Sequence, residues 1–113
     1  AIILDASIKV HNALGPGLLE SVYEEVLAYE LKKRGLKVER QKALPVYYDD
    51  LKMEVGFRLD LLVEDKVIIE LKSVEELIKK HFKITRNYLG LTGLKLALLI
   101  NFNETLLKMA TTE

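Results

Sequence analysis

Apolar residues recur along this chain at two different spacings, which predict helices on either side of a group of strands. Helical spacing covers residues 2–14, and the Pro and Gly of "LGPG" at residues 14–17 end that pattern. A second helix is predicted from about residue 18 to 34, where Gly35 is a typical C-cap residue. A third helix is predicted over residues 75–91.

Strand-like patterns separate and follow these helices. The predicted extended segments are residues 36–41, 44–48, 51–63, 67–74 and 94–102. Gly56 inside a strand pattern suggests a bulge or a close backbone approach. The order α-α-β-β-β-α-β, with the tail left unassigned, predicts an α/β (α+β) fold in which a mixed four-stranded sheet is flanked by helices. We expect a single domain over residues 1–113.

Composition narrows the class of protein. Half of the residues are hydrophobic and 30% are charged, which argues against disorder. No apolar run reaches the roughly 18 residues of a membrane span, and the start lacks the basic region of a signal peptide. The absence of cysteine excludes disulfides and thiolate metal sites and fits the cytoplasm. Basic and acidic residues balance at 17 each, which counts mildly against a nucleic-acid binder.

The segment "VIIELKSV" (67–74) places two charges inside an apolar strand. Side chains two residues apart share one face of a strand, so Glu70 and Lys72 lie beside Ile68. Such charged residues are rarely buried unless they are paired. Their partners therefore depend on the neighbouring strand.

The length of the turn before this strand decides which residues face each other. A two-residue loop would place Asp60 opposite Ile69, whereas a three-residue loop at residues 64–66 pairs Val63 with Val67 and brings Asp60 opposite Glu70. Apolar matching favours the three-residue loop. It aligns Leu59, Leu61 and Val63 with Val67, Ile69 and Leu71.

Two facing carboxylates repel each other unless a cation lies between them. One interpretation is a neutral quartet in which Asp60 pairs with Lys72 and Arg58 pairs with Glu70. The other is a hard-cation site, because Mg²⁺ takes one or two carboxylates and keeps several waters. In that site Lys72 could deprotonate a water or neutralise charge that builds up on a phosphate.

Two motifs carry a resemblance to a known family. Asp60 followed by Glu70-x-Lys72 resembles the signature of PD-(D/E)xK nucleases, whose core has the order α-β-β-β-α-β. The segment "GLLESVY" (17–23) reads G-x-x-E-x-x-Y. The chain closely resembles the GxxExxY family, a branch of the PD-(D/E)xK superfamily, and would carry an extra N-terminal helix. The matching segments include residues 10–25, 58–74 and 87–103.

The resemblance implies roles for five residues. Asp60 and Glu70 would bind a divalent metal ion, Mg²⁺ or Mn²⁺, with the Leu71 carbonyl as a third protein ligand. Lys72 would be the catalytic lysine. Glu20 matches a glutamate that the first core helix often directs at the metal; its alternative role is that of a first-turn residue favoured by the helix dipole.

Three further residues are candidates for positions near a substrate. Tyr23 is expected to be a core aromatic whose hydroxyl lies near the site. His11 belongs to the family pattern, although a His near a helix end is more often structural, and Tyr88 lies on the third predicted helix. Glu24 and Glu25 are expected to be solvated.

The resemblance, together with these residues, implies a cytoplasmic, Mg²⁺-dependent nuclease whose partner is DNA or RNA. The alternative is a non-catalytic nucleic-acid- or protein-binding module that keeps the fold and the site residues. The neutral charge favours the alternative, as does Ile84, since related nucleases place Gln four residues before the tyrosine. The intact acidic and lysine set argues against it. No membrane partner is expected, and a homo-oligomer is left open.

Overall fold

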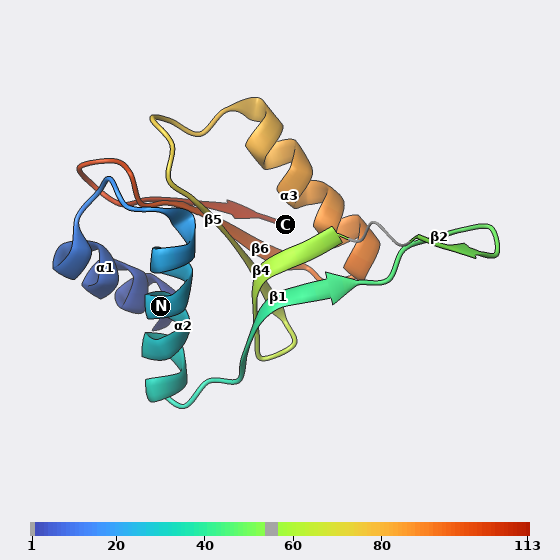
Figure 1. The fold of residues 1–113 in the computed structure, drawn as a ribbon, viewed down its shortest axis with the longest axis horizontal. Coiled ribbons are helices and arrows are strands. Elements are labelled where there is room, and N and C mark those ends of the chain that lie inside the picture. Colours follow the sequence, from blue (N-terminus) through green and yellow to red (C-terminus); the bar gives the residue numbers. More distant parts are fainter. Residues whose placement is uncertain (1, 54–56) are drawn as a thin grey trace.

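Helices cover both faces of a twisted sheet (Figure 1). The computed structural model describes residues 2–53 and 57–113, so Gly56 lies outside the described residues. Helices α1 (Ile2–Leu14) and α2 (Glu20–Lys33) lie on one face, and α3 (Lys79–Thr92) lies on the other. The first two helices are close to their predicted bounds, whereas α3 begins four residues later than predicted.

The sheet is mixed, as predicted, but it has one more strand than expected. The strands are β1 (Val38–Leu44), β2 (Tyr47–Tyr48), β3 (Leu51–Lys52), β4 (Phe57–Val63), β5 (Val67–Lys72), β6 (Leu96–Asn101) and β7 (Lys108–Thr112). Five of them form one sheet in the order β1-β4-β5-β6-β7, in which β5 and β6 are parallel. Strands β2 and β3 form a separate hairpin that projects from the body (Figure 1).

The fifth strand explains why a four-stranded sheet was a wrong expectation. Strand β7 comes from the tail that the sequence left unassigned, and it pairs antiparallel with β6. Its residues are mostly half-buried or exposed, so the tail has no strong hydrophobic alternation. The free edge of β6 supplies the backbone partners instead, and pairing across that edge is a tertiary effect.

The turn between β4 and β5 has the predicted three-residue length. Val63 pairs with Val67, and the ladder continues to the pair of Leu61 with Ile69. Glu64 and Asp65 both adopt a φ of 54°, the left-handed conformation that such a tight reversal requires. The predicted register of this hairpin is therefore confirmed.

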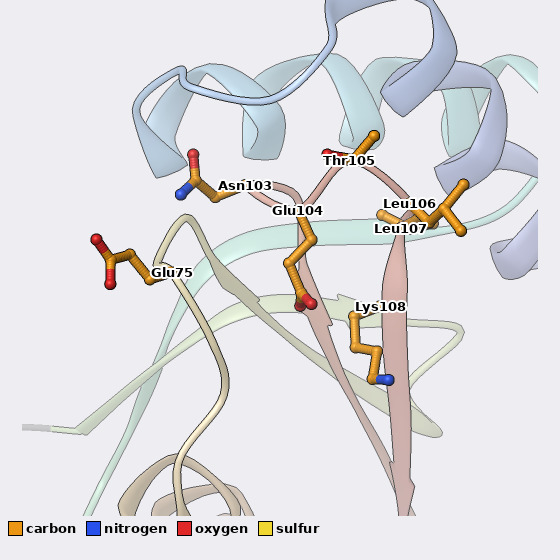
Figure 2. A pocket seen from close by; sticks show the side chains of 7 residues that line it. All are labelled: Glu75, Asn103, Glu104, Thr105, Leu106, Leu107 and Lys108. Atoms are coloured by element: carbon orange, nitrogen blue, oxygen red, sulfur yellow. The ribbon is translucent and has the colours of Figure 1, made fainter.

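Asn101 ties together the loops that leave β5 and β6. Its buried side-chain amide donates to the Val74 carbonyl at 2.9 Å and to the Glu104 carboxylate at 3.0 Å. The Asn101 side-chain oxygen accepts a hydrogen bond from the Val74 N–H at 3.1 Å. Residues of both loops line an open cavity of about 750 Å³ (Figure 2). This buried amide fixes the point at which the chain leaves the end of β5.

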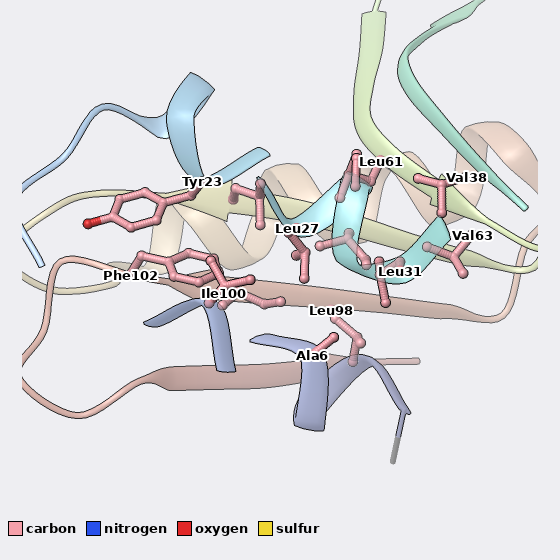
Figure 3. Close-up of a cluster of buried hydrophobic side chains, with 14 residues drawn as sticks. Ala6, Tyr23, Leu27, Leu31, Val38, Leu61, Val63, Leu98, Ile100 and Phe102 are labelled. Carbon is pink, nitrogen blue, oxygen red and sulfur yellow. The ribbon is translucent and has the colours of Figure 1, made fainter. Parts of the chain in front are cut away.

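The larger core lies between the sheet and helices α1 and α2 (Figure 3). Tyr23 and Phe102 are both fully buried, and their rings stack with centroids 4.6 Å apart. A smaller cluster under α3 contains Leu59, Leu62, Ile68, Leu89 and Ala97. Because the middle strands are covered on both faces, they can carry the continuous apolar runs seen in the sequence.

Tyr23 also holds the loop that leads into α2. Its hydroxyl donates to the Gly15 carbonyl at 2.5 Å and accepts a hydrogen bond from the Leu18 N–H at 3.1 Å. Gly15 and Gly17 both have positive φ, at 71° and 96°, so this tight loop favours glycine at both places. The tyrosine thereby sets where α2 begins, one helical turn before its own position.

We expect Tyr23→Phe to lower the free energy of unfolding by about 0.5–1.5 kcal/mol, because the Gly15 carbonyl and the Leu18 N–H lose their hydrogen bonds to the Tyr23 hydroxyl. Urea denaturation would measure this change. Tyr29→Phe is the matched control, since that side chain is 64% exposed and its loss should change stability little. Equal effects of the two substitutions would contradict a role for the Tyr23 hydroxyl in holding the loop.

Candidate active site

Two carboxylates occupy a split between β4 and β5. The backbone pairing of β4 with β5 ends at Leu61 and Ile69, and beyond this pair the strands are joined by hydrogen bonds from backbone N–H groups to side chains. The Leu71 N–H donates to Asp60 Oδ2 at 2.8 Å, and the Asp60 N–H donates to Glu70 Oε1 at 3.2 Å. Asp60 and Glu70 are therefore neighbours, as the register predicted, and each replaces a bond that two flat strands would make between their backbones.

The split coincides with a kink at Asp60 on β4. Leu59 packs in the cluster under α3, whereas Leu61 packs in the core under α2, although a regular strand would place both on one face. The expected alignment of Leu59 with Leu71 across the hairpin was therefore wrong, since these two residues pack in different clusters. The kink turns the Asp60 side chain toward α2, and alternation alone does not reveal it.

Asp60 lines a cavity of about 310 Å³ between α2 and the sheet. The lining residues are Glu20, Ser21, Glu24, Gln41, Asp60 and Leu71. Glu20 is exposed at the first position of α2, and its Oε2 accepts a hydrogen bond from the Ser73 N–H at 3.3 Å. Its carboxylate thus lies at the end of β5, directly after Lys72. Glu20 is also the first residue of α2, which was the alternative role expected from the sequence.

Glu24 was expected to be solvated, and that expectation was wrong. It is 6% exposed, and its carboxylate accepts hydrogen bonds from Arg40 at 3.2 Å and from the Gln41 amide at 2.5 Å. These two donors compensate the burial of its charge. Glu25, the next residue of α2, is exposed as expected.

Burial and repulsion act together on Glu70. Removal from water, followed by the negative charge of Asp60, raises the pKa of Glu70 to about 9. The charge of Lys72 acts in the opposite direction, and it is the weakest of these influences. At neutral pH the Glu70 carboxyl is thus protonated in the metal-free protein.

The neutral ion quartet is not formed. Among the ion pairs of the described residues, none joins Asp60 to Lys72 or Arg58 to Glu70. Arg58 instead donates to the backbone carbonyl of Gln41 at 3.3 Å. The diagonal pairs depended on a regular sheet, whereas β4 leaves the regular ladder at Asp60.

The donor set fits a divalent cation that takes few ligands from the protein. Within residues 2–53 and 57–113, no three His, Cys, Asp or Glu side chains converge as a closed metal cage. Asp60 and Glu70 supply two carboxylates, which suffice for Mg²⁺ with several waters. A bound cation would offset the burial and the Asp60 charge that together raise the pKa of Glu70.

The other candidates divide into one near the carboxylates and two with structural roles. Tyr88 is half-buried on α3, and burial together with the charges of Glu70 and Asp60 raises its pKa. The Tyr88 ring also packs edge-on against the Phe57 ring, with the two ring centroids 6.3 Å apart. His11 donates from Nε2 to the Glu104 carbonyl at 2.8 Å, so it anchors a loop.

Two of the three substrate-proximal candidates lie in the core, where a core aromatic at Tyr23 and a structural His11 were expected. His11 is 7% exposed and packs near Phe102 in the core. Tyr23 is fully buried, and its hydroxyl is engaged by the loop before α2. The sequence missed Gln41, which lines the cavity, because nothing in the pattern of β1 distinguishes it from its polar neighbours.

The comparisons with known proteins agree with this geometry. A family model described as the PD-(D/E)XK nuclease superfamily matches residues 1–112, and the chain belongs to this superfamily. Its nucleases generally use divalent metal ions and act on nucleic acid. No curated protein and no solved structure matched the chain. No helix in the described part of the chain has the length and apolar character to cross a membrane.

The raised pKa of Glu70 predicts how stability changes with pH in metal-free buffer. The unfolded chain releases this proton near pH 4.5 and the folded chain near pH 9. Between these values the folded state binds more protons, so the free energy of unfolding should fall as the pH rises from about 5 to about 9. Urea denaturation at a series of pH values in EDTA would measure the slope.

Two substitutions separate this carboxyl from the others. Glu70→Gln should flatten the slope, because it removes the titrating group. Glu25→Gln removes an exposed carboxyl outside the cavity and should keep the wild-type slope. A Glu70→Gln protein with an unchanged slope would refute the assignment.

Proposed function

We propose that this chain is a Mg²⁺-dependent nuclease that hydrolyses phosphodiester bonds of nucleic acid, with Mn²⁺ as a substitute ion. The observation that carries this proposal is the pair of carboxylates, Asp60 and Glu70, in the split between β4 and β5. The spacing of Gly17, Glu20 and Tyr23 supports membership of the GxxExxY branch. The absence of cysteine supports a cytoplasmic location.

Asp60 and Glu70 would hold the ion, with the Leu71 carbonyl as a further ligand and Glu20 at the edge of the site. Leu71 lines the same cavity as Asp60, and Glu20 reaches that cavity from the start of α2. When bound, a divalent cation neutralises phosphate charge and supplies a nucleophilic water at neutral pH. The Leu71 N–H keeps one oxygen of Asp60 engaged, which restricts rotation of that carboxylate.

Lys72 would act on the phosphate or on the attacking water. It lies two residues after Glu70 on β5, and its side chain is half-buried. Among the described residues it is in no ion pair with Asp60 or Glu70, so its ammonium group is not neutralised by them. A cation in this place stabilises the charge that develops on a phosphate in the transition state.

The distribution of charge supports nucleic acid as the partner. The chain is neutral overall, but α3 has the sequence "KKHFKITRNYLGLT", which contains no acidic residue. Its exposed cations are Lys79, Lys80, Lys83 and Arg86. Positive charge gathered on one element attracts a polyanion even where the net charge is zero.

A non-catalytic binding module is the second candidate. Ile84 lies one helical turn before Tyr88 on α3, is 38% exposed and brings no polar group toward the site. A module that only binds nucleic acid would tolerate an apolar residue at this position. The basic character of α3 suits either candidate.

Mg²⁺ should stabilise the protein through the carboxylate pair. An ion bound only by the folded state raises stability in proportion to ln(1 + [L]/Kd). The melting temperature of the wild type should therefore rise with millimolar Mg²⁺, and Glu70→Gln should abolish that rise. Identical responses of the two proteins in a thermal melt would exclude a metal site at Glu70.

Lys72→Ala should lower kcat by about 10²–10³-fold, because it removes a charge that acts in the transition state. Mg²⁺ affinity should change little. Cleavage of labelled single- and double-stranded DNA and RNA, beside a melt of each variant, would test both expectations. Lys66→Ala, in the exposed turn before β5, is the matched control and should keep wild-type activity.

The same assay separates the two candidate functions. Ile84→Gln should raise cleavage if the chain is a weakened nuclease. If neither the wild type nor Ile84→Gln cuts any of the four substrates, and Lys72→Ala loses only stability, the binding module is the better description.

A further inference from the structure

Gln41 lies at a break in the pairing of β1 with β4. Arg40 pairs with Leu61 and Lys42 pairs with Leu59, but Gln41 and Asp60 between them are not paired in the ladder. The register is the same on both sides, so neither strand has gained a residue. Both strands depart from the ladder at this one position.

The backbone of Gln41 is in the left-handed region, with a φ of 49°. This conformation is uncommon for a residue with a Cβ and strains the chain unless the surroundings hold it. Arg58 contributes to holding it by donating to the Gln41 carbonyl at 3.3 Å. Non-glycine residues kept in this conformation cluster at functional sites, and this one lines the candidate cavity.

The side-chain amide of Gln41 bridges two carboxylates on different elements. Its Nε2 lies 2.5 Å from Glu24 Oε1 on α2 and 3.5 Å from Asp60 Oδ1 on β4. A primary amide has two N–H groups, so one nitrogen can donate to both oxygens. Arg40 holds the other oxygen of Glu24 at 3.2 Å, which makes Glu24 a fixed anchor for the bridge.

This bridge involves Asp60 Oδ1, the carboxylate oxygen that does not accept the hydrogen bond from the Leu71 N–H. Asp60 Oδ2 is engaged by the Leu71 N–H at 2.8 Å, whereas Oδ1 faces Gln41. A carboxylate oxygen has two lone pairs, so Oδ1 can accept the amide hydrogen and still bind a cation. The amide is neutral, so it orients the carboxylate without cancelling the negative charge that attracts the ion.

We propose that Gln41 is a positioning residue, which holds the Asp60 carboxylate for a divalent cation by bridging it to Glu24. This inference rests on the proposed function, since it assigns a partner to one of the proposed metal ligands. Groups that hydrogen-bond to a ligating carboxylate typically change metal affinity by 10–100-fold when they are replaced.

Two substitutions at Gln41 distinguish the effect of its side-chain amide from the effect of its strained backbone. Gln41→Met has similar length and keeps a Cβ, but it lacks the N–H donors. Gln41→Gly removes the side chain and also relieves the positive φ. Both variants should weaken Mn²⁺ binding by about 10–100-fold in calorimetry with the metal alone. Urea melts in EDTA, run on the same samples, should show that Gln41→Gly is folded at the temperature of the titration.

Control variants identify the source of any change. Lys42→Ala removes the next, exposed side chain of β1 and should bind Mn²⁺ as the wild type does. Asp60→Ala should abolish binding. If Asp60→Ala abolishes binding while both Gln41 variants keep the wild-type Kd, the positioning role is wrong and the metal site stands. If the wild type itself binds no Mn²⁺, the metal site and the role of Gln41 are both wrong.

Discussion

The burial of the Glu70 carboxyl beside the charge of Asp60 is the constraint around which this site is organised. Burial and the charge of Asp60 raise the pKa of Glu70 to about 9. In the metal-free fold the Glu70 carboxyl therefore keeps its proton at neutral pH, where an exposed carboxyl would lose it. The strands do not close over the pair. They separate instead, and the carboxylates accept the N–H groups of Asp60 and Leu71, which leaves no penalty for unpaired backbone donors there.

The elements around the split supply what the pair lacks. Helix α2 brings Glu20 to the mouth of the cavity, and the buried hydroxyl of Tyr23 fixes where that helix starts. In the G-x-x-E-x-x-Y motif, the tyrosine thus fixes the helix start that carries the glutamate, one helical turn before it. On the other face, burial raises the pKa of Tyr88 on α3, and the nearby charges of Glu70 and Asp60 raise it further. Asn101 holds the loop that leaves β5 after Lys72.

The kink at Gln41 and Asp60 gives the sheet its functional asymmetry. A regular β4 would direct Asp60 to the same face as Leu62, under α3. The observed strand changes face between Leu59 and Leu61, and Asp60 therefore faces the cavity beside α2. The left-handed conformation of Gln41 accompanies this change and places an amide between the carboxylates of α2 and β4.

Much of this arrangement could be predicted from local pattern. Hydrophobic spacing located the helices, and apolar matching across a three-residue turn paired Val63 with Val67, because a slip by one residue would move every side chain to the other face. The neighbouring positions of Asp60 and Glu70 followed from that register.

Contacts between distant segments decided the rest. Strand β7 forms because β6 has a free edge, Glu24 is buried because Arg40 and Gln41 reach it, and His11 and Tyr23 hold loops because the packing of α1 and α2 brings them there. Periodicity describes which face a regular element buries, whereas a kink, a buried ion pair and an added edge strand depend on partners that are remote in the chain.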